Sequence, residues 1–172
     1  MRQFLTILGV FGGLTVAQAQ SYVAELDPFQ EVPPHNTPGY GSADFTLSGT
    51  TLSVDVGTGV YNDLLAGAST VRLQDAAVGV NGPTIFTFNL DTPGNTSGTF
   101  SSSGTLTAGQ ITDLNAGNLY VNITDPVFPS GEIRGQLEAV PEPSTLALLG
   151  AGSLALLAGA ARKSLMMCNC PG

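Results

Sequence analysis

The middle of the chain alternates apolar and polar residues with a period of two, and this restricts it to β-structure. Residues 42–48 read SADFTLS and residues 51–56 read TLSVDV, so Ala, Phe, Leu and Val recur at every second position. Such alternation places one face of a strand on a core and the other in water. Gly49-Thr50 separates the two runs and suits a two-residue hairpin turn with Gly at its first position.

The same patterning recurs through the rest of this region. Strands are predicted in GASTVRLQD, GPTIFTFNL, GNLYVNITD and SGEIRGQLEA, and a Gly-rich hairpin in SGTFSSSGTL. Turn signals return about every ten residues, which favours an all-β, antiparallel, Greek-key-like sandwich or barrel. The residues predicted to face its core are Phe45, Leu47, Val54, Phe86, Val121 and Leu137.

One short helix interrupts the strands. Thr107 and Gln110 have the spacing of a capping box, in which each side chain satisfies the other residue's backbone N–H. Ile111 and Leu114 follow on one face, and Gly117 is placed to end the helix. Residues 27–43, in contrast, are rich in Pro and Gly and are expected to form a loop or an edge segment.

Residues 1–19 have the three parts of a secretory signal peptide. Arg2 is followed by an apolar stretch and then by Ala17-Gln18-Ala19, a small-x-small cleavage site. An N-terminal membrane anchor is the alternative, but the apolar stretch is short for one. Export is therefore expected.

Residues 20–140 combine high acidity with an absence of cysteine. They carry twelve Asp or Glu against Arg72 and Arg134, a formal charge of −10, so nucleic acid is not expected as a partner. Without disulfides the region must be stabilised by a core. Cys168 and Cys170 lie near the end of the sequence, and two thiols are too few for a closed metal site.

A second apolar stretch lies near the end of the sequence. Residues 145–161 carry no charge, and as a helix they would span roughly 26 Å, enough for a bilayer core. The basic pair Arg162-Lys163 follows and is expected to stop translocation, leaving residues 164–172 as a cytoplasmic tail. A buried core helix is the alternative, for which a small β domain has little room.

The motif before this stretch resembles the PEP-CTERM sorting signal of Gram-negative bacteria. It consists of Pro141, Glu142 and Pro143, followed by the apolar helix and the basic pair, so the whole signal spans residues 141–163. The resemblance implies processing by a membrane-embedded exosortase and a link to exopolysaccharide or biofilm. Residues 164–172 depart from the family, whose members usually end sooner.

Residues 20–140 resemble a CHRD domain, the module named for chordin. The segments that carry the resemblance are FQEVPP, PGYGSADFTL, GVNGPTIFTF, LTAGQITDLNAGNLYVNI and PSGEIRGQL. The family commonly has a His-x-His pair where this chain has Arg72-Leu73-Gln74, and another His where it has Thr124. Those histidines give the family a likeness to copper–zinc dismutases, and without them no metal or other cofactor is expected here.

No catalytic residue is predicted. His35 is the single histidine and lies in the Pro-rich segment, where we expect it exposed, and no hydrolase or phosphate-binding motif is present. Aspartates near strand ends leave calcium binding or hydrolysis open as weaker alternatives. Glu132 and Arg134 lie two apart, on the face of a strand predicted to be polar. They are expected either to pair with each other or with a charge on a neighbouring strand, or, through Arg134, to contact a ligand such as an acidic polysaccharide.

The sequence thus predicts an exported, non-enzymatic protein of the cell surface or extracellular matrix. The expected partners are an exosortase-type peptidase, the membrane through the C-terminal helix, and exopolysaccharide. The protein is expected at the outer surface of the inner membrane before processing, and then at the cell surface or outside the cell. The alternative is a metal-dependent binding protein or an enzyme built on a dismutase-like β-barrel.

Overall fold

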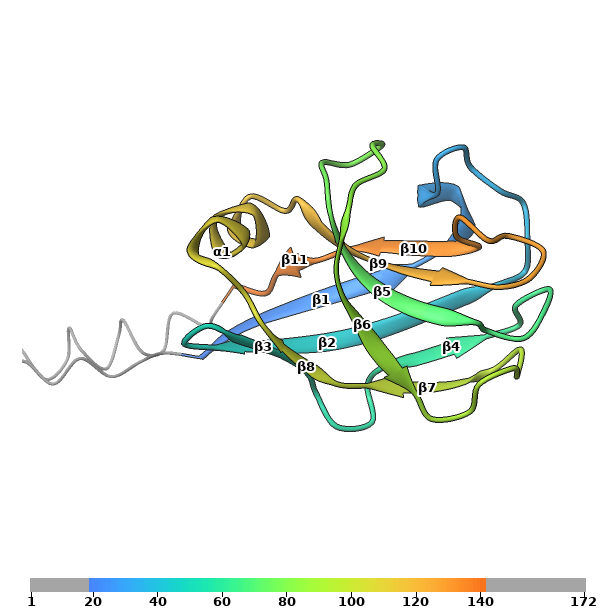
Figure 1. Cartoon of the computed structure of the whole chain (residues 1–172), viewed down its shortest axis with the longest axis horizontal. Helices are drawn as coiled ribbons and strands as arrows, with labels where there is room; N and C mark the ends of the chain where they lie inside the picture. The colour runs from blue at the N-terminus through green and yellow to red at the C-terminus, as the bar shows by residue number, and fades with distance from the viewer. Residues whose placement is uncertain (1–18, 142–172) are drawn as a thin grey trace, which may run out of the picture. The chain divides into compact units, whose positions relative to one another are not determined.

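A computed structural model of the chain describes residues 19–141 (Figure 1). The signal peptide, apart from Ala19, lies outside the described residues, and so do the predicted transmembrane helix, its basic stop and the tail. Among the residues that are described, no helix has the length and apolar character needed to cross a membrane.

The described chain is almost entirely β-structure, with one α-helix and one short 3-10 helix. The all-β prediction with a single short helix is confirmed. In chain order the elements are β1 (Gln20–Leu26), η1 (Pro28–Gln30), β2 (Tyr40–Ser48), β3 (Thr51–Val54), β4 (Val60–Asn62), β5 (Thr70–Asp75), β6 (Thr84–Leu90), β7 (Gly98–Ser101), β8 (Ser103–Thr105), α1 (Ala108–Asn115), β9 (Leu119–Thr124), β10 (Ile133–Gln136) and β11 (Glu138–Ala139).

The strands form one antiparallel sheet that closes on itself. Its order is β10-β9-β5-β6-β7-β4-β2-β1-β11, with β3 and β8 branching from β2. The two ends of this order, β10 and β11, are consecutive pieces of one chain segment. β11 pairs with β1, and β10 meets β1 at the bridge between Arg134 and Asp27. We call this boundary, residues 22–27 against residues 134–139, the seam.

The turn predicted at Gly49 and the helix predicted after Thr107 are both present in the structure. Gly49 has φ of 61°, and Ser48 pairs with Thr51, as in a two-residue hairpin that needs Gly first. The capping box of α1 is present: Thr107 N donates to Gln110 Oε1 at 2.8 Å, and Gln110 N donates to Thr107 Oγ1 at 3.3 Å. Beyond the helix Gly117 has φ of 74°, the conformation typical of a helix end.

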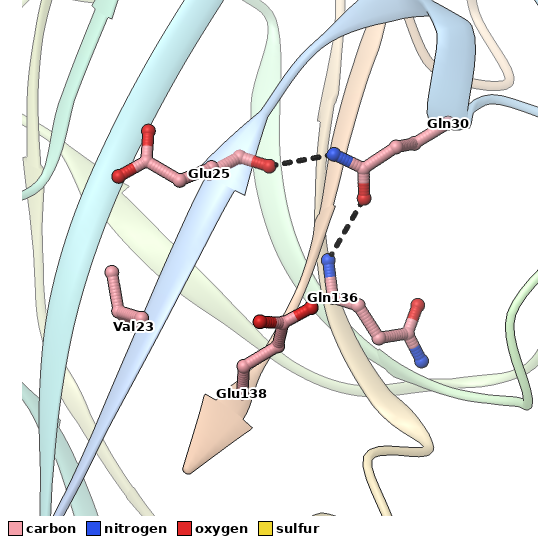
Figure 2. Close-up of a pocket in the computed structure, with 5 residues that line it drawn as sticks. All are labelled: Val23, Glu25, Gln30, Gln136 and Glu138. Atoms are coloured by element: carbon pink, nitrogen blue, oxygen red, sulfur yellow. Dashed lines mark hydrogen bonds between the residues drawn. The ribbon is translucent and has the colours of Figure 1, made fainter. Parts of the chain in front are cut away.

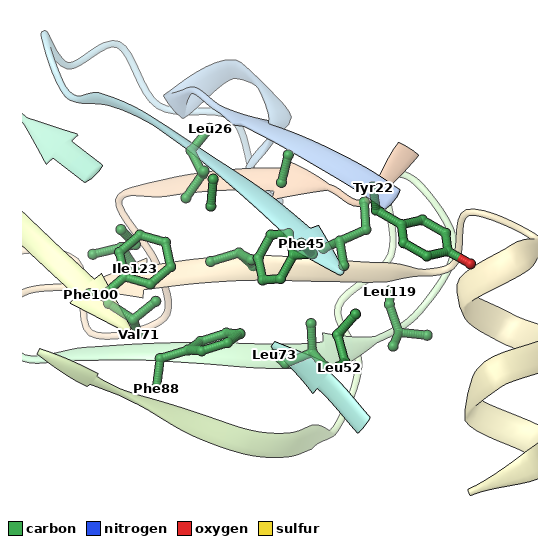
Figure 3. Close-up of a cluster of buried hydrophobic side chains, with 14 of the residues drawn as sticks. Tyr22, Leu26, Phe45, Leu52, Val71, Leu73, Phe88, Phe100, Leu119 and Ile123 are labelled. Atoms are coloured by element: carbon green, nitrogen blue, oxygen red, sulfur yellow. The ribbon is translucent and has the colours of Figure 1, made fainter. Parts of the chain in front are cut away.

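The core consists of aliphatic side chains packed around a cluster of phenylalanine rings (Figure 3). The Phe88 ring on β6 lies 5.9 Å from Phe45 on β2 and 5.6 Å from Phe100 on β7, measured between ring centroids. The predicted burial of Phe45, Leu47, Val121 and Leu137 is confirmed. Aromatic pairs at these separations add to the stability that comes from area burial.

Two predicted core residues lie at the margin. Val54 is only half-buried, because β3 ends there and the following residues leave the sheet. Phe86 is half-buried because β6 pairs with β7 only at Asn89 and Leu90, so the first part of β6 lacks a neighbour on that side. Its ring is covered in part by β8, where a side chain in place of Gly104 would overlap it.

Candidate functional site

The polar side chains of β9 and β10 lie on the face of the strands turned away from the core. Alternation in the sequence predicted that Glu132 and Arg134 would be solvated on this face. That prediction is wrong, since Glu132 is 0% and Arg134 1% exposed. Hydrogen bonds tie this face to residues 27–39 and residues 76–82, which follow β1 and β5. The face is therefore a second, polar interior.

Arg134 lies at the centre of this interior. Its Nη1 donates to the Val80 carbonyl at 2.9 Å, and its Nη2 donates to the Ala77 carbonyl at 3.3 Å and to Gln136 Oε1 at 3.2 Å. The guanidinium carbon lies 3.4 Å from the centroid of the Tyr120 ring, a cation–π contact. Burial lowers the pKa of Arg134, opposed by Tyr120 and Glu31, but a guanidinium stays charged in proteins.

Glu132 has different partners. Both its carboxyl oxygens accept from the Leu65 backbone N–H, at 3.0 and 3.1 Å. The buried Asp125 carboxylate nearby accepts from Ala66 N at 3.0 Å and from Val127 N at 2.9 Å. Burial raises the pKa of Glu132 to about 7, and the neighbouring Asp125 contributes in the same direction. In the described chain, none of these hydrogen bonds joins Glu132 to Arg134, so the two do not form the expected pair.

A third acidic group, Glu31, lies at the edge of the same interior. Its side chain is buried, and burial raises its pKa to about 7, while the Arg134 charge and the Val32 backbone N–H act in the opposite direction. Arg134 and Glu132 as ligand contacts remain a prediction. A ligand would reach them only if the covering segments moved.

The positions that correspond to the family's histidines come together on β5 and β9. Arg72 lies opposite Asn122, Gln74 opposite Tyr120, and Thr124 opposite Thr70. The Thr70 and Thr124 hydroxyls are 2.8 Å apart, and Gln74 Nε2 donates to the Gly82 carbonyl at 3.0 Å. Within residues 19–141 no three His, Cys, Asp or Glu side chains gather as a metal site.

His35 lies in the segment after η1, as the sequence indicated, but it is less exposed than expected. Its ring centroid lies 4.3 Å from that of Phe128, and the side chain is half-buried. Its backbone N–H donates to the Pro28 carbonyl at 2.9 Å. His35 thus helps to hold residues 27–39 in place.

A groove of about 280 Å³ opens along the seam (Figure 2). The residues that line it are Val23, Glu25, Gln30, Gln136 and Glu138. Sequence reasoning missed this groove because its residues come from three separate segments and share no motif. The FQEVPP segment that contains Gln30 carries part of the family resemblance and lies in the predicted Pro-rich loop, and neither feature indicates a groove.

The sorting motif begins directly after the sheet. Val140 N donates to the Ser21 carbonyl at 2.9 Å, extending the pairing of β11 with β1 by one residue. The next residue, Pro141, is exposed, and Glu142 and Pro143 lie outside the described residues. The first residues after the predicted signal cleavage and the last residues before the motif are therefore hydrogen-bonded neighbours.

This closed β domain followed by a C-terminal sorting motif defines an exported, sorted surface protein. The CHRD domain family matches residues 22–137, and the PEP-CTERM protein-sorting motif matches residues 139–163. The first match covers more than half of the sequence, and the chain belongs to the CHRD domain family. The motif indicates export and processing by an exosortase, a membrane protein, to the cell surface or extracellular space. No curated protein and no solved structure matches the chain.

Proposed function

We propose that this protein is a non-enzymatic component of the cell surface or extracellular matrix that associates with exopolysaccharide. The observation that carries the proposal is that the CHRD domain ends at residue 137 and the sorting motif begins at residue 139. The domain is thus the part that the sorting system delivers. Its buried polar groups also support a structural role, since Arg134 and Glu132 hold loops together.

The charge distribution supports a neutral or amine-bearing polymer over an acidic one. Of the two arginines in residues 20–140, Arg134 is buried, which leaves the acidic surface with Arg72 alone. The seam groove offers carboxylates from Glu25 and Glu138 beside the Gln30 and Gln136 amides. Such oxygens accept hydrogen bonds from hydroxyl and ammonium groups, whereas they repel a uronic acid.

The experiment is co-sedimentation of the processed surface form with matrix polysaccharide from its host. A Glu25→Gln, Glu138→Gln double variant should bind an amine-bearing polymer more weakly. Asp63→Asn is the matched control, because Asp63 is exposed outside the groove and Asn tolerates its positive φ of 55°. Failure of the unmodified protein to bind any fraction of the matrix would refute the proposal.

A metal-dependent binding protein or enzyme is the second candidate. Its support is that Arg72, Gln74 and Thr124, at the family's histidine positions, lie on adjacent paired strands. Elemental analysis of protein purified without added ions separates the two candidates. We expect no stoichiometric copper or zinc, because guanidinium, amide and hydroxyl groups are poor ligands for these ions.

A further inference from the structure

Two buried oxygens that can only accept hydrogen bonds converge on Gly131. They are Glu31 Oε1 and Asn122 Oδ1, and neither has a partner among the described residues. The side chains are 3% and 2% exposed. A β-carbon at position 131 would overlap both of them, and Gly131 also has φ of 144°. Only glycine allows the two side chains to approach this closely.

The orientation of the Asn122 amide is fixed by its other end. Its Nδ2 donates to the Ser130 carbonyl at 3.0 Å. Rotating the amide by half a turn would place its oxygen against that carbonyl and lose this bond. Oδ1 is therefore the end of the amide that lacks a donor, and it lies beside Glu31 Oε1 at Gly131, so an ionised Glu31 would add a second unpaired acceptor there. Leaving buried acceptors unpaired costs roughly 1–3 kcal/mol each.

A proton removes this conflict, because a neutral carboxyl group becomes a donor. A metal cation is a poorer solution, since the charge of Arg134 acts on Glu31 and would repel it. We infer that one proton, held between Glu31 Oε1 and Asn122 Oδ1, fastens residues 27–39 to β9 and makes their closure over Arg134 depend on pH.

Other contacts of this segment with the rest of the domain come from Asp27, Gln30, Val32 and His35. Asn81 Nδ2 donates to the Val32 carbonyl at 2.9 Å, and His35 packs on Phe128. If Glu31 lost this proton, its negative charge would lie beside Asn122 Oδ1 of β9. Residues 27–39 should then open more often, and the side of Arg134 that faces Glu31 would become accessible to an anion.

The charges around Glu31 set the pH range. The charged and titratable groups on its own segment and on the packed elements are Asp27, His35, Tyr120, Asp125, Glu132 and Arg134. Of these, Arg134 lowers the pKa of Glu31, and burial raises it further than Arg134 lowers it, to about 7. The contribution of this proton to closure is thus complete below about pH 4.5 and is lost as the pH rises through 7, so the segment is expected to be tighter at pH 6 than at pH 8. This inference does not depend on the proposed polymer.

The test is hydrogen exchange of the full chain, read on residues 31–39 and corrected for the intrinsic effect of pH. Protection should fall by about tenfold per pH unit as the pH rises from the ordinary carboxyl pKa of 4.5 to the folded value of about 7, and should level off above it. In Glu31→Gln the amide donates to Asn122 at every pH, so its protection should stay level. Asp63→Asn, at an exposed carboxyl outside this segment, is the control and should follow the unmodified protein.

A second measurement needs no variant. Carbon NMR of the unmodified chain should show the Glu31 carboxyl still protonated at pH 6 and titrating near neutral pH. If this carboxyl is ionised at pH 6, Glu31 is a counter-ion of Arg134, or a water bridges the two oxygens, and the inference is wrong. It is equally wrong if protection of residues 31–39 does not change between pH 6 and pH 8.

Discussion

The side chain of Gln30 stands between Gln136 and β1 and bridges the seam there with two hydrogen bonds. Gln136 N donates to Gln30 Oε1 at 3.3 Å, and Gln30 Nε2 donates to the Glu25 carbonyl at 2.8 Å (Figure 2). On either side the antiparallel register is the same, with Arg134 opposite Asp27 and Glu138 opposite Val23. The amide therefore takes the place of a direct bond between Gln136 N and the Glu25 carbonyl.

Replacing Gln30 with Ala should weaken the seam. It leaves the Gln136 N–H and the Glu25 carbonyl without their partner beside an open groove, at an expected cost of about 0.5–1.5 kcal/mol in the free energy of unfolding. Denaturant titration measures it. The adjacent Phe29→Ala is the control, because Phe29 is 67% exposed, and it should change stability by less than about 0.5 kcal/mol. Equal effects of the two substitutions would contradict the role of the amide.

Phe88→Ala should be far more costly than Phe86→Ala, although both lie on β6. Phe88 is buried between Phe45 and Phe100, so its loss should cost roughly 3–5 kcal/mol. Phe86 is half-buried and should cost clearly less. Because total stability is typically about 5–15 kcal/mol, Phe88→Ala approaches loss of folding. Thermal unfolding of the two variants side by side decides between this order and the reverse.

The two arginines of the domain offer a matched pair. Arg134→Leu removes the donors for the Val80 and Ala77 carbonyls and should destabilise the fold by roughly 3 kcal/mol. Arg72→Leu changes a half-exposed side chain on β5 and should have a much smaller effect. The midpoints of chemical denaturation give the comparison. A neutral Arg134→Leu would mean that the guanidinium does not hold the loop of residues 76–82.

Stability should decrease as the pH rises through neutrality, in part because of Glu132. Its pKa is about 7 in the folded protein against an ordinary value of 4.5, so folding takes up a proton between these limits. The stabilisation is complete below about pH 4.5 and is lost as the pH rises through 7. Glu132→Gln should therefore flatten the fall in denaturation midpoint between pH 5 and pH 8. The exposed Glu138→Gln should leave the slope unchanged.

Processing should remove everything after about Pro143, including both cysteines. Pro fixes its own φ and disfavours helix in the residue before it, so the sequence of residues 141–143 predicts an extended segment that a peptidase could bind. Mass spectrometry of surface protein from the native host reads the new terminus. A strain without the exosortase should keep the chain on the membrane. Released, mature protein that still ends at Gly172 would rule out this processing.

The sequence predicted best the features that depend on contacts between residues close together in the chain. The hairpin at Gly49 and the capping box at Thr107 depend on contacts within a few residues, and both are present. The alternation that buried Phe45 and Val121 was also sufficient, because a regular strand transmits it without further information.

The polar interior could not be predicted in this way. Alternation showed which side of β10 Arg134 occupies, but whether that side meets water depends on the loops of residues 27–39 and residues 76–82, which are distant in sequence. Phe86 and Phe88 likewise have the same parity, and only the short pairing of β6 with β7 distinguishes their burial. The family resemblance gave the domain bounds but not these contacts.

The pairing of β11 with β1 has a mechanical consequence. A force applied to the C-terminal tail would reach β11 first, where Glu138, Ala139 and Val140 would detach from β1 one after another. Detaching these three residues would release roughly 10 Å of extended chain. Only then would load reach Leu137, whose backbone N–H donates to Leu119 on β9. The tail would thus be joined to the barrel through a short strand that can detach from β1 and pair with it again. A brief force would extend this strand before it reached the core.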